Sequence, residues 1–295
     1  MSFSEKINNG KFIITAEVAP PRGTDYRTII EGIKPLKGYV DGFNVTDNQR
    51  SMVRASSIAM AKILLDSGFE PICQFTARDR NRIALQSDLL GAYMLGIRNI
   101  CLMTGDFITL GDERGAKPVF DVDSLLMLKI VKILEEGHLI NGKELKGKPS
   151  FNVGAVFNPF AGPEKLQIEK LKKKVELGAK FIQTQPVYDI ETAKRTHEII
   201  KETGAIPIIG LLPIKSLKMA NFIKKLNPES VPDTFIEKLS KVKDPHAYGW
   251  EYTLEIAHGI AEFGKGIHFM LVGKTYELAK FIDYLKNESP YNHKF

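Results

Sequence analysis

Cysteine is scarce in this 295-residue chain, and its two cysteines, Cys73 and Cys101, both lie in short apolar runs. Their spacing does not match that of a metal site, and we interpret both as buried free thiols. No apolar run approaches the length needed to span a bilayer, and residues 1–6 contain no apolar segment of the signal-peptide type. These absences predict a cytoplasmic protein with no membrane partner.

Signatures of several common enzyme classes are also missing. There is no Gly-x-Gly-x-x-Gly turn, so a dinucleotide would have to bind by another device. The segment Leu102–Asp106 is not a phosphate-binding P-loop. The six histidines are scattered along the chain, and no Ser-His-Asp or Cys-His arrangement suggests a nucleophilic enzyme.

The chain is basic, with a formal net charge of +6 and far more lysine than arginine. Much of the positive charge lies on predicted helical faces such as residues 170–174, where exposure to solvent is the ordinary explanation. A positive protein also favours anionic ligands, such as phosphates or a polycarboxylate tail. Basic and aromatic residues do not interleave, so we expect no nucleic-acid partner.

Eight short apolar segments have the character of buried strands, and a helical pattern follows each of them. The predicted strands are 12–18, 42–45, 71–75, 99–103, 151–157, 179–184, 206–211 and 266–271. The predicted helices are 26–36, 53–67, 83–95, 123–136, 164–177, 190–203, 217–226, 233–242, 246–263 and 276–286. This alternation predicts an α/β protein, a single (β/α)8 TIM-type barrel over residues 1–295, with an open doubly wound sheet as the alternative.

The segment from Ile100 to Asp106 shows why the strand ends matter. Its apolar residues stop at Thr104-Gly105-Asp106, the pattern of a buried parallel strand that ends in a tight turn. Active sites of α/β proteins gather at the carboxyl ends of the strands. Asp106 is therefore a candidate for chemistry, and a cap on the following helix is the alternative role.

Other strands also end in polar residues, which a barrel would bring to one mouth. The set is Glu17, Thr46, Asp47, Gln74, Thr76, Asp106, Asn158 and Gln185. Glu17 is the most informative because it lies inside an apolar strand, just before Pro20-Pro21-Arg22. A lone buried carboxyl group costs several kcal/mol unless it is partnered or neutral, so we expect Glu17 to act as an acid. An ion pair with Arg22 is the alternative.

The ordered motifs resemble those of the methylenetetrahydrofolate reductase family. They are Thr15–Arg22, Asn44–Thr46, Leu102–Asp106, Gly178–Gln185, Gly210–Pro213 and Gly266–Phe269. The resemblance is to the compact bacterial catalytic barrel. It implies a flavin-dependent oxidoreductase of one-carbon metabolism and methionine biosynthesis that reduces 5,10-methylenetetrahydrofolate to 5-methyltetrahydrofolate. A flavin, FAD or FMN, would take hydride from NADH or NADPH and pass it to the folate in a ping-pong cycle.

The resemblance also implies roles for individual residues. Glu17 matches the general acid that opens the imidazolidine ring to an iminium ion, and Asp106 matches the carboxylate beside the flavin and the pterin. Gln185 matches a residue that contacts both folate and nicotinamide. The residues expected at the cofactor are Thr46, Asp47, Gln74, Thr104, Gly105, Asp106, Asn158, Lys173 and Lys174.

The chain departs from the family pattern at several positions. Met219 and Lys274 stand where the family often has a Gln and an Arg that contact substrate, and Gln74 stands where many members have His. Glu17, Asp106, Gln185, Met219 and Lys274 form the predicted substrate set. A homo-oligomer, or a complex with a second subunit, is the expected assembly. A flavin-free (β/α)8 lyase or transferase that uses Glu17 as a base, or a non-catalytic binding subunit, is the alternative function.

Overall fold

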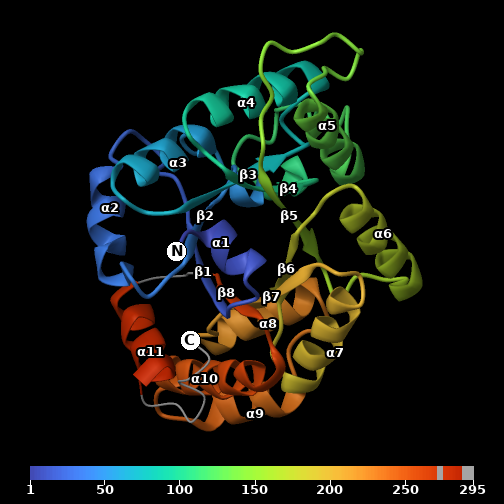
Figure 1. Ribbon diagram of the computed structural model, residues 1–295. Helices are drawn as coiled ribbons and strands as arrows, with labels where there is room; N and C mark the ends of the chain where they lie inside the picture. The colour runs from blue at the N-terminus through green and yellow to red at the C-terminus, as the bar shows by residue number, and fades with distance from the viewer. Residues whose placement is uncertain (271–274, 288–295) are drawn as a thin grey trace.

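The protein forms a closed barrel of parallel strands surrounded by helices (Figure 1). The computed structural model describes residues 1–270 and 275–287. The strands, in chain order and in their order around the barrel, are β1 (Ile13–Val18), β2 (Gly42–Val45), β3 (Pro71–Thr76), β4 (Asn99–Met103), β5 (Asn152–Phe157), β6 (Phe181–Pro186), β7 (Ile206–Leu211) and β8 (Gly266–Phe269). Because β1 pairs with β8, the barrel prediction is confirmed and the open sheet is excluded.

The helices cover the outside of the barrel, apart from α1 (Figure 1). The α-helices are α1 (Phe3–Asn8), α2 (Arg27–Ile33), α3 (Ser57–Asp66), α4 (Arg82–Met94), α5 (Ser124–Glu136), α6 (Glu164–Glu176), α7 (Ile190–Lys201), α8 (Leu217–Leu226), α9 (Asp233–Lys241), α10 (Pro245–Phe263) and α11 (Thr275–Asn287). The short 3-10 helices are η1 (Lys34–Leu36), η2 (Gln49–Ser51) and η3 (Ile108–Leu110). Among the described residues, no helix is both long enough and apolar enough to cross a bilayer.

The predicted elements differ from the observed ones mainly at their ends. The helix predicted over 26–36 changes to the 3-10 form at Lys34, beside Pro35, which has no N–H to donate. The helix predicted over 53–67 begins only at Ser57, where the Ser56 hydroxyl accepts from the amide of Ala59. The strand predicted over 266–271 ends at Phe269, and its last predicted residue lies outside the described ranges.

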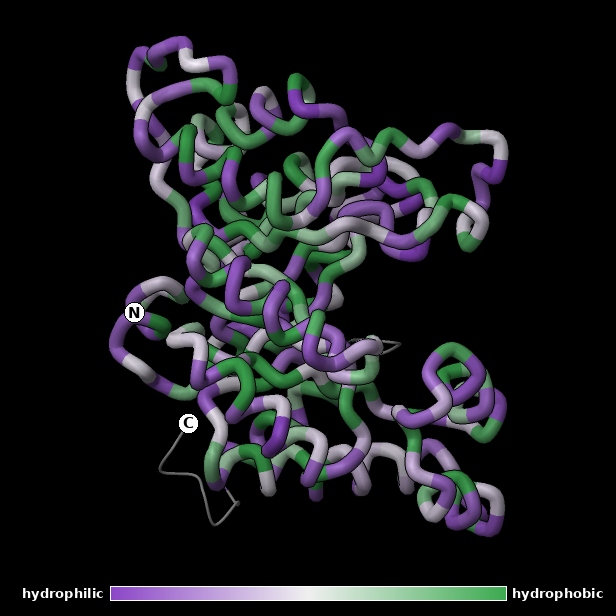
Figure 2. The backbone as a smooth tube through the Cα atoms, turned by 90° about the vertical axis from the view of Figure 1, so that its right-hand side faces the viewer, coloured by the Kyte–Doolittle hydropathy of each residue, from purple (hydrophilic) through white to green (hydrophobic). Residues whose placement is uncertain are grey.

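The interior of the barrel is apolar at its amino-terminal end. Inward-facing side chains of five strands pack there with Phe3 and Ile7 of α1, namely Ile13, Ile72, Cys101, Phe181 and Ile208. The rings of Phe3 and Phe181 meet edge to face with their centroids 5.3 Å apart. The sequence interpretation missed α1, which seals this end of the barrel. Figure 2 shows the amino terminus at the same end.

Strand alternation explains where the cysteines lie. Cys101 points into the barrel, whereas Cys73 points outward into the layer between the sheet and the helices. Both are buried free thiols, as predicted. Removal from water disfavours the thiolate and raises the pKa of each thiol to about 12.

The apolar end of the barrel interior depends on a close approach at Gly154 of β5. A Cβ atom placed on Gly154 would lie 2.2 Å from the Phe181 ring, which is fully buried and has no room to move. We predict that Gly154→Ala lowers the free energy of unfolding by roughly 1–3 kcal/mol, the usual cost of overpacking a core. Chemical denaturation monitored by circular dichroism would measure it.

Gly91 in α4 supplies the matched control, because a Cβ placed there meets nothing within 4 Å. Gly91→Ala should leave the protein unchanged or stabilise it by up to about 1 kcal/mol, through the better helix propensity of alanine. Equal stability of Gly154→Ala and the parent would contradict the packing described for the barrel interior.

Candidate active site

The carboxyl-terminal half of the barrel interior is polar, in contrast to the other half. Alternation along the strands directs polar side chains inward from five of them. These residues are Thr15 and Glu17 of β1, Asn44 of β2 with Thr46 just after it, Gln74 of β3, Gln183 and Gln185 of β6, and His268 of β8. A mouth lined in this way is where parallel barrels carry out chemistry.

Glu17 faces a histidine that the sequence interpretation did not single out. The Glu17 side chain is only 13% exposed, and its Oε1 lies 3.8 Å from Nε2 of His268. Gln49 donates a long hydrogen bond to the same carboxylate, with Nε2 3.4 Å from Oε2. Arg22 does not pair with Glu17, because its guanidinium lies 3.4 Å from Asp112 instead. The alternative role of Glu17, an ion pair with Arg22, is therefore wrong.

The far side of the His268 ring is held by two other strands. Its Nδ1 atom lies 2.9 Å from the Thr15 hydroxyl and 3.3 Å from the Asn44 side-chain nitrogen. His268 itself is 2% exposed. Alternation in Gly266-Ile267-His268 was the signal that could have placed this histidine inside the barrel, next to Glu17 on the neighbouring strand.

Asp106 lies at the mouth but contacts a neighbouring loop and not a helix. Its carboxylate is exposed, and Oδ2 accepts from the backbone N–H of Arg50 at 2.8 Å. The chain turns at Gly105, whose φ of +93° lies in the left-handed region that glycine adopts without strain. The predicted end of β4 at Met103 is confirmed. Asp106 thus accepts from the Arg50 amide, whereas its alternative role was a cap on the following helix.

The loops after β2 and β4 are joined by a buried arginine. Arg78 is 2% exposed, and its guanidinium donates to the Ser51 hydroxyl at 3.0 Å and to the Asn48 carbonyl at 3.2 Å. Ser51 in turn donates to the Phe107 carbonyl at 2.9 Å. Asn48, Arg50 and Ser51 all have positive φ, so these polar contacts hold a strained loop beside Asp106.

Asp47 does not join the other candidates at the mouth. Thr46 points inward, so Asp47 points outward, and it is buried at 4% exposure between β2, β3 and α3. Its carboxylate accepts from the amide and hydroxyl of Thr76 at 2.9 and 2.8 Å and pairs with Arg80 at 2.5 Å. Burial lowers the pKa of Arg80, but the charges and hydrogen bonds of Asp47 and Asp88 together raise this pKa above its usual value. Asp47 therefore joins two strands and a helix.

The remaining candidates are divided between the mouth and other places. Thr104 and Gln185 are exposed where β4 and β6 end, and Gln74 is buried inside the barrel. Asn158, after β5, accepts from the amide of Phe160 at 3.0 Å, as in an Asx turn. Met219 of α8 packs against a separate apolar cluster of helices α8, α9 and α10.

The two lysines of α6 have opposite environments. Lys173 is exposed, whereas Lys174 is buried and donates to the Val156 carbonyl at 2.6 Å. Burial lowers the pKa of Lys174 to about 8. The structure therefore does not present the two as a matched pair of cations. Lys274 lies outside the described residues.

Three buried polar atoms at the inner wall have no hydrogen-bond partner within the described part of the chain. They are Oδ1 of Asn44, Oγ1 of Thr46 and Nε2 of Gln183. An unpaired buried donor or acceptor costs roughly 1–3 kcal/mol, so such atoms usually mark a place where a ligand or water binds. Together these atoms offer two acceptors and two donors, because the Thr46 hydroxyl can act as either. This set fits the ring edge of a flavin, which carries carbonyl oxygens, ring nitrogens and N–H groups.

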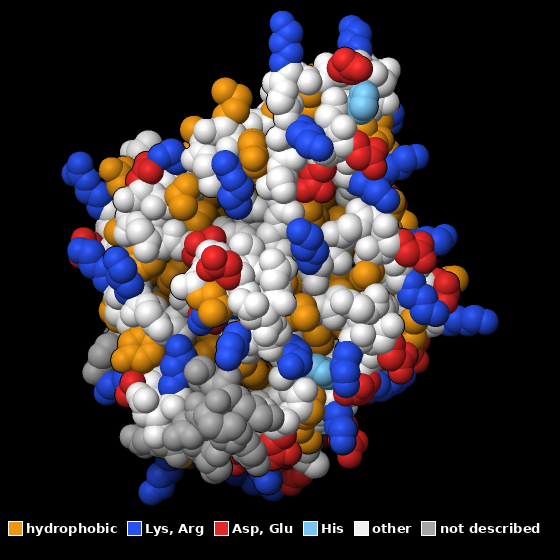
Figure 3. Space-filling model, viewed as in Figure 1, with side chains coloured by type: hydrophobic (Ala, Val, Ile, Leu, Met, Phe, Trp, Pro, Cys, Tyr) orange, Lys and Arg blue, Asp and Glu red, His pale blue; other side chains and the backbone are white. Residues whose placement is uncertain are grey.

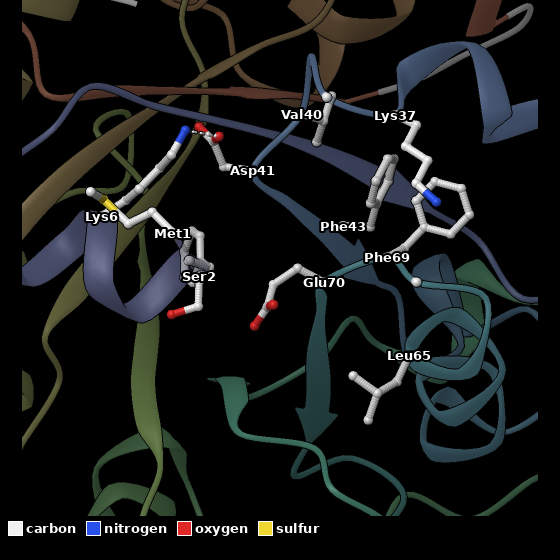
Figure 4. Close-up of a pocket in the computed structure, with 13 residues that line it drawn as sticks. Met1, Ser2, Lys6, Lys37, Val40, Asp41, Phe43, Leu65, Phe69 and Glu70 are labelled. Carbon is white, nitrogen blue, oxygen red and sulfur yellow. Dashed lines mark hydrogen bonds and ion pairs between the residues drawn. The ribbon is translucent and has the colours of Figure 1, made fainter.

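A separate cavity of about 560 Å³ lies at the other end of the barrel (Figure 4). Its lining includes Lys6 and Asp41, which form an ion pair, and Lys37 and Glu70. None of the candidate site residues that the structure describes lines it. Figure 3 shows that the lysine and arginine side chains on this face are spread among acidic side chains and do not gather into one basic patch.

The sequence as a whole matches one protein family. The family model for "Methylenetetrahydrofolate reductase" matches residues 2–285, a span that contains every strand of the barrel. The chain belongs to the methylenetetrahydrofolate reductase family. The resemblance seen in the short motifs is thereby confirmed over nearly the whole chain.

Individual relatives are distant in sequence. A probable methylenetetrahydrofolate reductase (NADPH) of Caenorhabditis elegans is 25% identical over 222 residues, 72% of this chain and 31% of its own length. A 5,10-methylenetetrahydrofolate reductase of Buchnera aphidicola is 26% identical over 243 residues, 79% of this chain and 74% of its own. The match thus spans about a third of the length of the C. elegans relative.

The fold is shared with a solved structure of an uncharacterized protein from Clostridium thermocellum that binds two copies of 5-methyl-5,6,7,8-tetrahydrofolic acid. The two superpose with a TM-score of 0.67 over 97% of this chain and 98% of the other. Their sequence identity is 17%, so this likeness shows a shared fold alone.

The buried Asp47 pair predicts a large effect on stability. Asp47→Asn keeps the shape of the side chain but leaves Arg80, 12% exposed, with only the more exposed Asp88 as a carboxylate partner. We expect the free energy of unfolding to fall by roughly 3 kcal/mol, because breaking a buried ion pair leaves a charge without its main partner. Urea denaturation would measure it, with Asp66→Asn on the exposed Lys62–Asp66 pair as control. Equal, small effects of the two substitutions would contradict the role given to Asp47.

Proposed function

We propose that this protein is a flavin-dependent reductase that converts 5,10-methylenetetrahydrofolate to 5-methyltetrahydrofolate with electrons from NADH or NADPH. The observation that carries the proposal is Glu17, a nearly buried carboxyl group at the barrel mouth of a methylenetetrahydrofolate reductase family member. A largely buried acid is what opening of the folate ring requires.

The flavin would lie against the inner wall of the mouth. Thr46, Gln74, Thr104, Gly105 and Asn158 would hold it, supported by the unpaired atoms of Asn44, Thr46 and Gln183. When bound, the flavin accepts a hydride from the nicotinamide and later donates a hydride to the folate. FAD is the form we propose, with FMN as the alternative.

Glu17 would act on the imidazolidine ring of the substrate. It donates its proton to one ring nitrogen while the bond from that nitrogen to the bridging carbon breaks, and the bonding electron pair stays on the nitrogen. The lone pair of the other ring nitrogen then forms an iminium ion with the bridging carbon. Hydride addition to this carbon gives the methyl group, and Glu17 is left as a carboxylate.

Asp106 would stabilise the positive charge of the iminium ion. It also disfavours negative charge on a reduced flavin close by, which makes the flavin a stronger hydride donor. At an effective dielectric of about 20, unit charges about 5 Å apart interact by roughly 3 kcal/mol, and exposure at the mouth screens much of this. Gln185, exposed at the same rim, would contact the folate and the nicotinamide in turn.

The cellular context follows from this activity. We propose a cytoplasmic enzyme that supplies methyl groups for one-carbon metabolism and methionine biosynthesis. It would act as a homo-oligomer or with a second subunit, with Met219 and Lys274 near the folate.

The visible spectrum of the purified protein is the first test. We expect the absorption bands of an oxidised flavin, bleaching by NADH or NADPH under anaerobic conditions, and recovery of colour when 5,10-methylenetetrahydrofolate is added. Chromatography of the cofactor released by denaturation would separate FAD from FMN. A protein that neither contains nor binds either flavin would overturn the proposal.

Replacement of Glu17 by Gln removes the acid and keeps the shape. Reduction of the flavin by the nicotinamide needs no proton from Glu17, so its rate should stay near the parental value. Oxidation of the reduced flavin by the folate should slow by ~10²-fold or more, the usual scale for loss of general acid catalysis. Stopped-flow absorbance would follow the two half-reactions separately. A parental rate of folate reduction would exclude Glu17 as the acid.

Replacement of Asp106 by Asn removes the charge while an oxygen remains to accept from the Arg50 amide. The loop should therefore keep its shape. We expect the flavin reduction potential to rise by roughly tens of millivolts and folate reduction to slow more than flavin reduction, because repulsion is lost. Redox titration against reference dyes would measure the potential. An unchanged potential with equal slowing of both half-reactions would mean that Asp106 only holds the loop.

A further inference from the structure

We propose that His268 is a positioning residue for Glu17, with Thr15 and Asn44 fixing its orientation and tautomer. This inference rests on the proposed function, since it concerns the acid step of folate reduction. It starts from four side chains on three adjacent strands, β8, β1 and β2, that meet inside the barrel mouth. None of the sequence motifs required His268 to have a role in chemistry.

The hydrogen bonds of the ring decide where its proton lies. The side-chain nitrogen of Asn44 can only donate, so Nδ1 of His268, 3.3 Å away, acts as the acceptor. Nδ1 is also 2.9 Å from the Thr15 hydroxyl, which can donate to it as well. The proton of the neutral ring is therefore on Nε2, the nitrogen that faces Glu17.

The separation between Nε2 and the Glu17 oxygen suits a bond that forms during the reaction. At 3.8 Å the two atoms are beyond hydrogen-bond distance, and catalytic hydrogen bonds are often long before substrate binds. Once Glu17 has given its proton to the substrate, a carboxylate remains in a largely buried place. The N–H of His268 would then approach and stabilise it, so the proton leaves Glu17 more readily.

Within the described ranges, Gln49 is the other polar side chain that contacts the Glu17 carboxylate, at 3.4 and 3.5 Å. It comes from the strained loop after β2, whereas His268 is 2% exposed and held by two strands. A donor on rigid strands holds its partner more accurately than one on a loop.

The test compares three variants at His268 and Thr15 in the flavin-loaded enzyme. His268→Leu removes the donor, and we expect folate reduction to slow by roughly 10- to 100-fold, as misplacement of a catalytic group does. His268→Gln, whose side-chain nitrogen can donate at nearly the same place, should recover much of the rate. Thr15→Val should slow this half-reaction less. Flavin reduction by the nicotinamide should keep its parental rate in all three.

A double variant separates positioning from a merely structural role. Because His268 acts through Glu17, His268→Leu should cost almost nothing further in a Glu17→Gln background. His197 supplies the matched control. It is a histidine of α7 with 1% exposure, away from the mouth, whose ring packs against Phe263. His197→Leu should leave both half-reactions at their parental rates.

The outcomes distinguish this inference from the proposed function. If the parent binds no flavin or does not reduce the folate, the proposed function fails. If the parent reduces the folate and His268→Leu does so equally fast, only the positioning role is overturned. Additive losses in the double variant, or equal slowing of both half-reactions by His268→Leu, would also overturn it. Should His268→Leu fail to fold, Thr15→Val and His268→Gln still test the same contact.

Discussion

The parallel pairing of β1 with β8 is the contact on which the rest of the site depends. It joins residues more than 250 positions apart and places Thr15 opposite His268 in the register of the two strands. Without this closure the two strands would be edges of a sheet, and Glu17 would face solvent. The same pairing keeps backbone groups satisfied along both strands, so architecture and chemistry rely on one set of hydrogen bonds.

Strand positions could be predicted well because their signal is local. The apolar runs at 42–45, 99–103 and 206–211 have the observed bounds, since each run is followed in the sequence by a polar residue or by Leu212-Pro213. The helix α1 was missed because its six residues are too few to show a helical period. Its packing under the barrel depends on Phe3 meeting Phe181, a contact between distant parts of the chain.

The candidate site could be predicted in outline, and the exceptions have physical reasons. Thr46 and Asp47 are neighbours, yet alternation turns one inward and the other outward, where Arg80 pairs with it. Lys173 and Lys174 are also neighbours, but they lie on different sides of α6. Lys173 is therefore exposed and Lys174 is buried. His268 was overlooked because its partners come from two other strands. A motif within one segment does not show which residues of other strands will contact it.

The apolar seal under the barrel separates the site from the lower end of the molecule. Among the described residues, Phe3, Ile7 and Phe181 pack across that end, below the polar mouth that holds Glu17. In the proposed reaction, the folate and the nicotinamide would both reach the inner wall from the mouth. The first product would then leave before the second ligand enters. The packing of α1, a helix of six residues, would thus bear on the order of ligand binding without contact with either ligand.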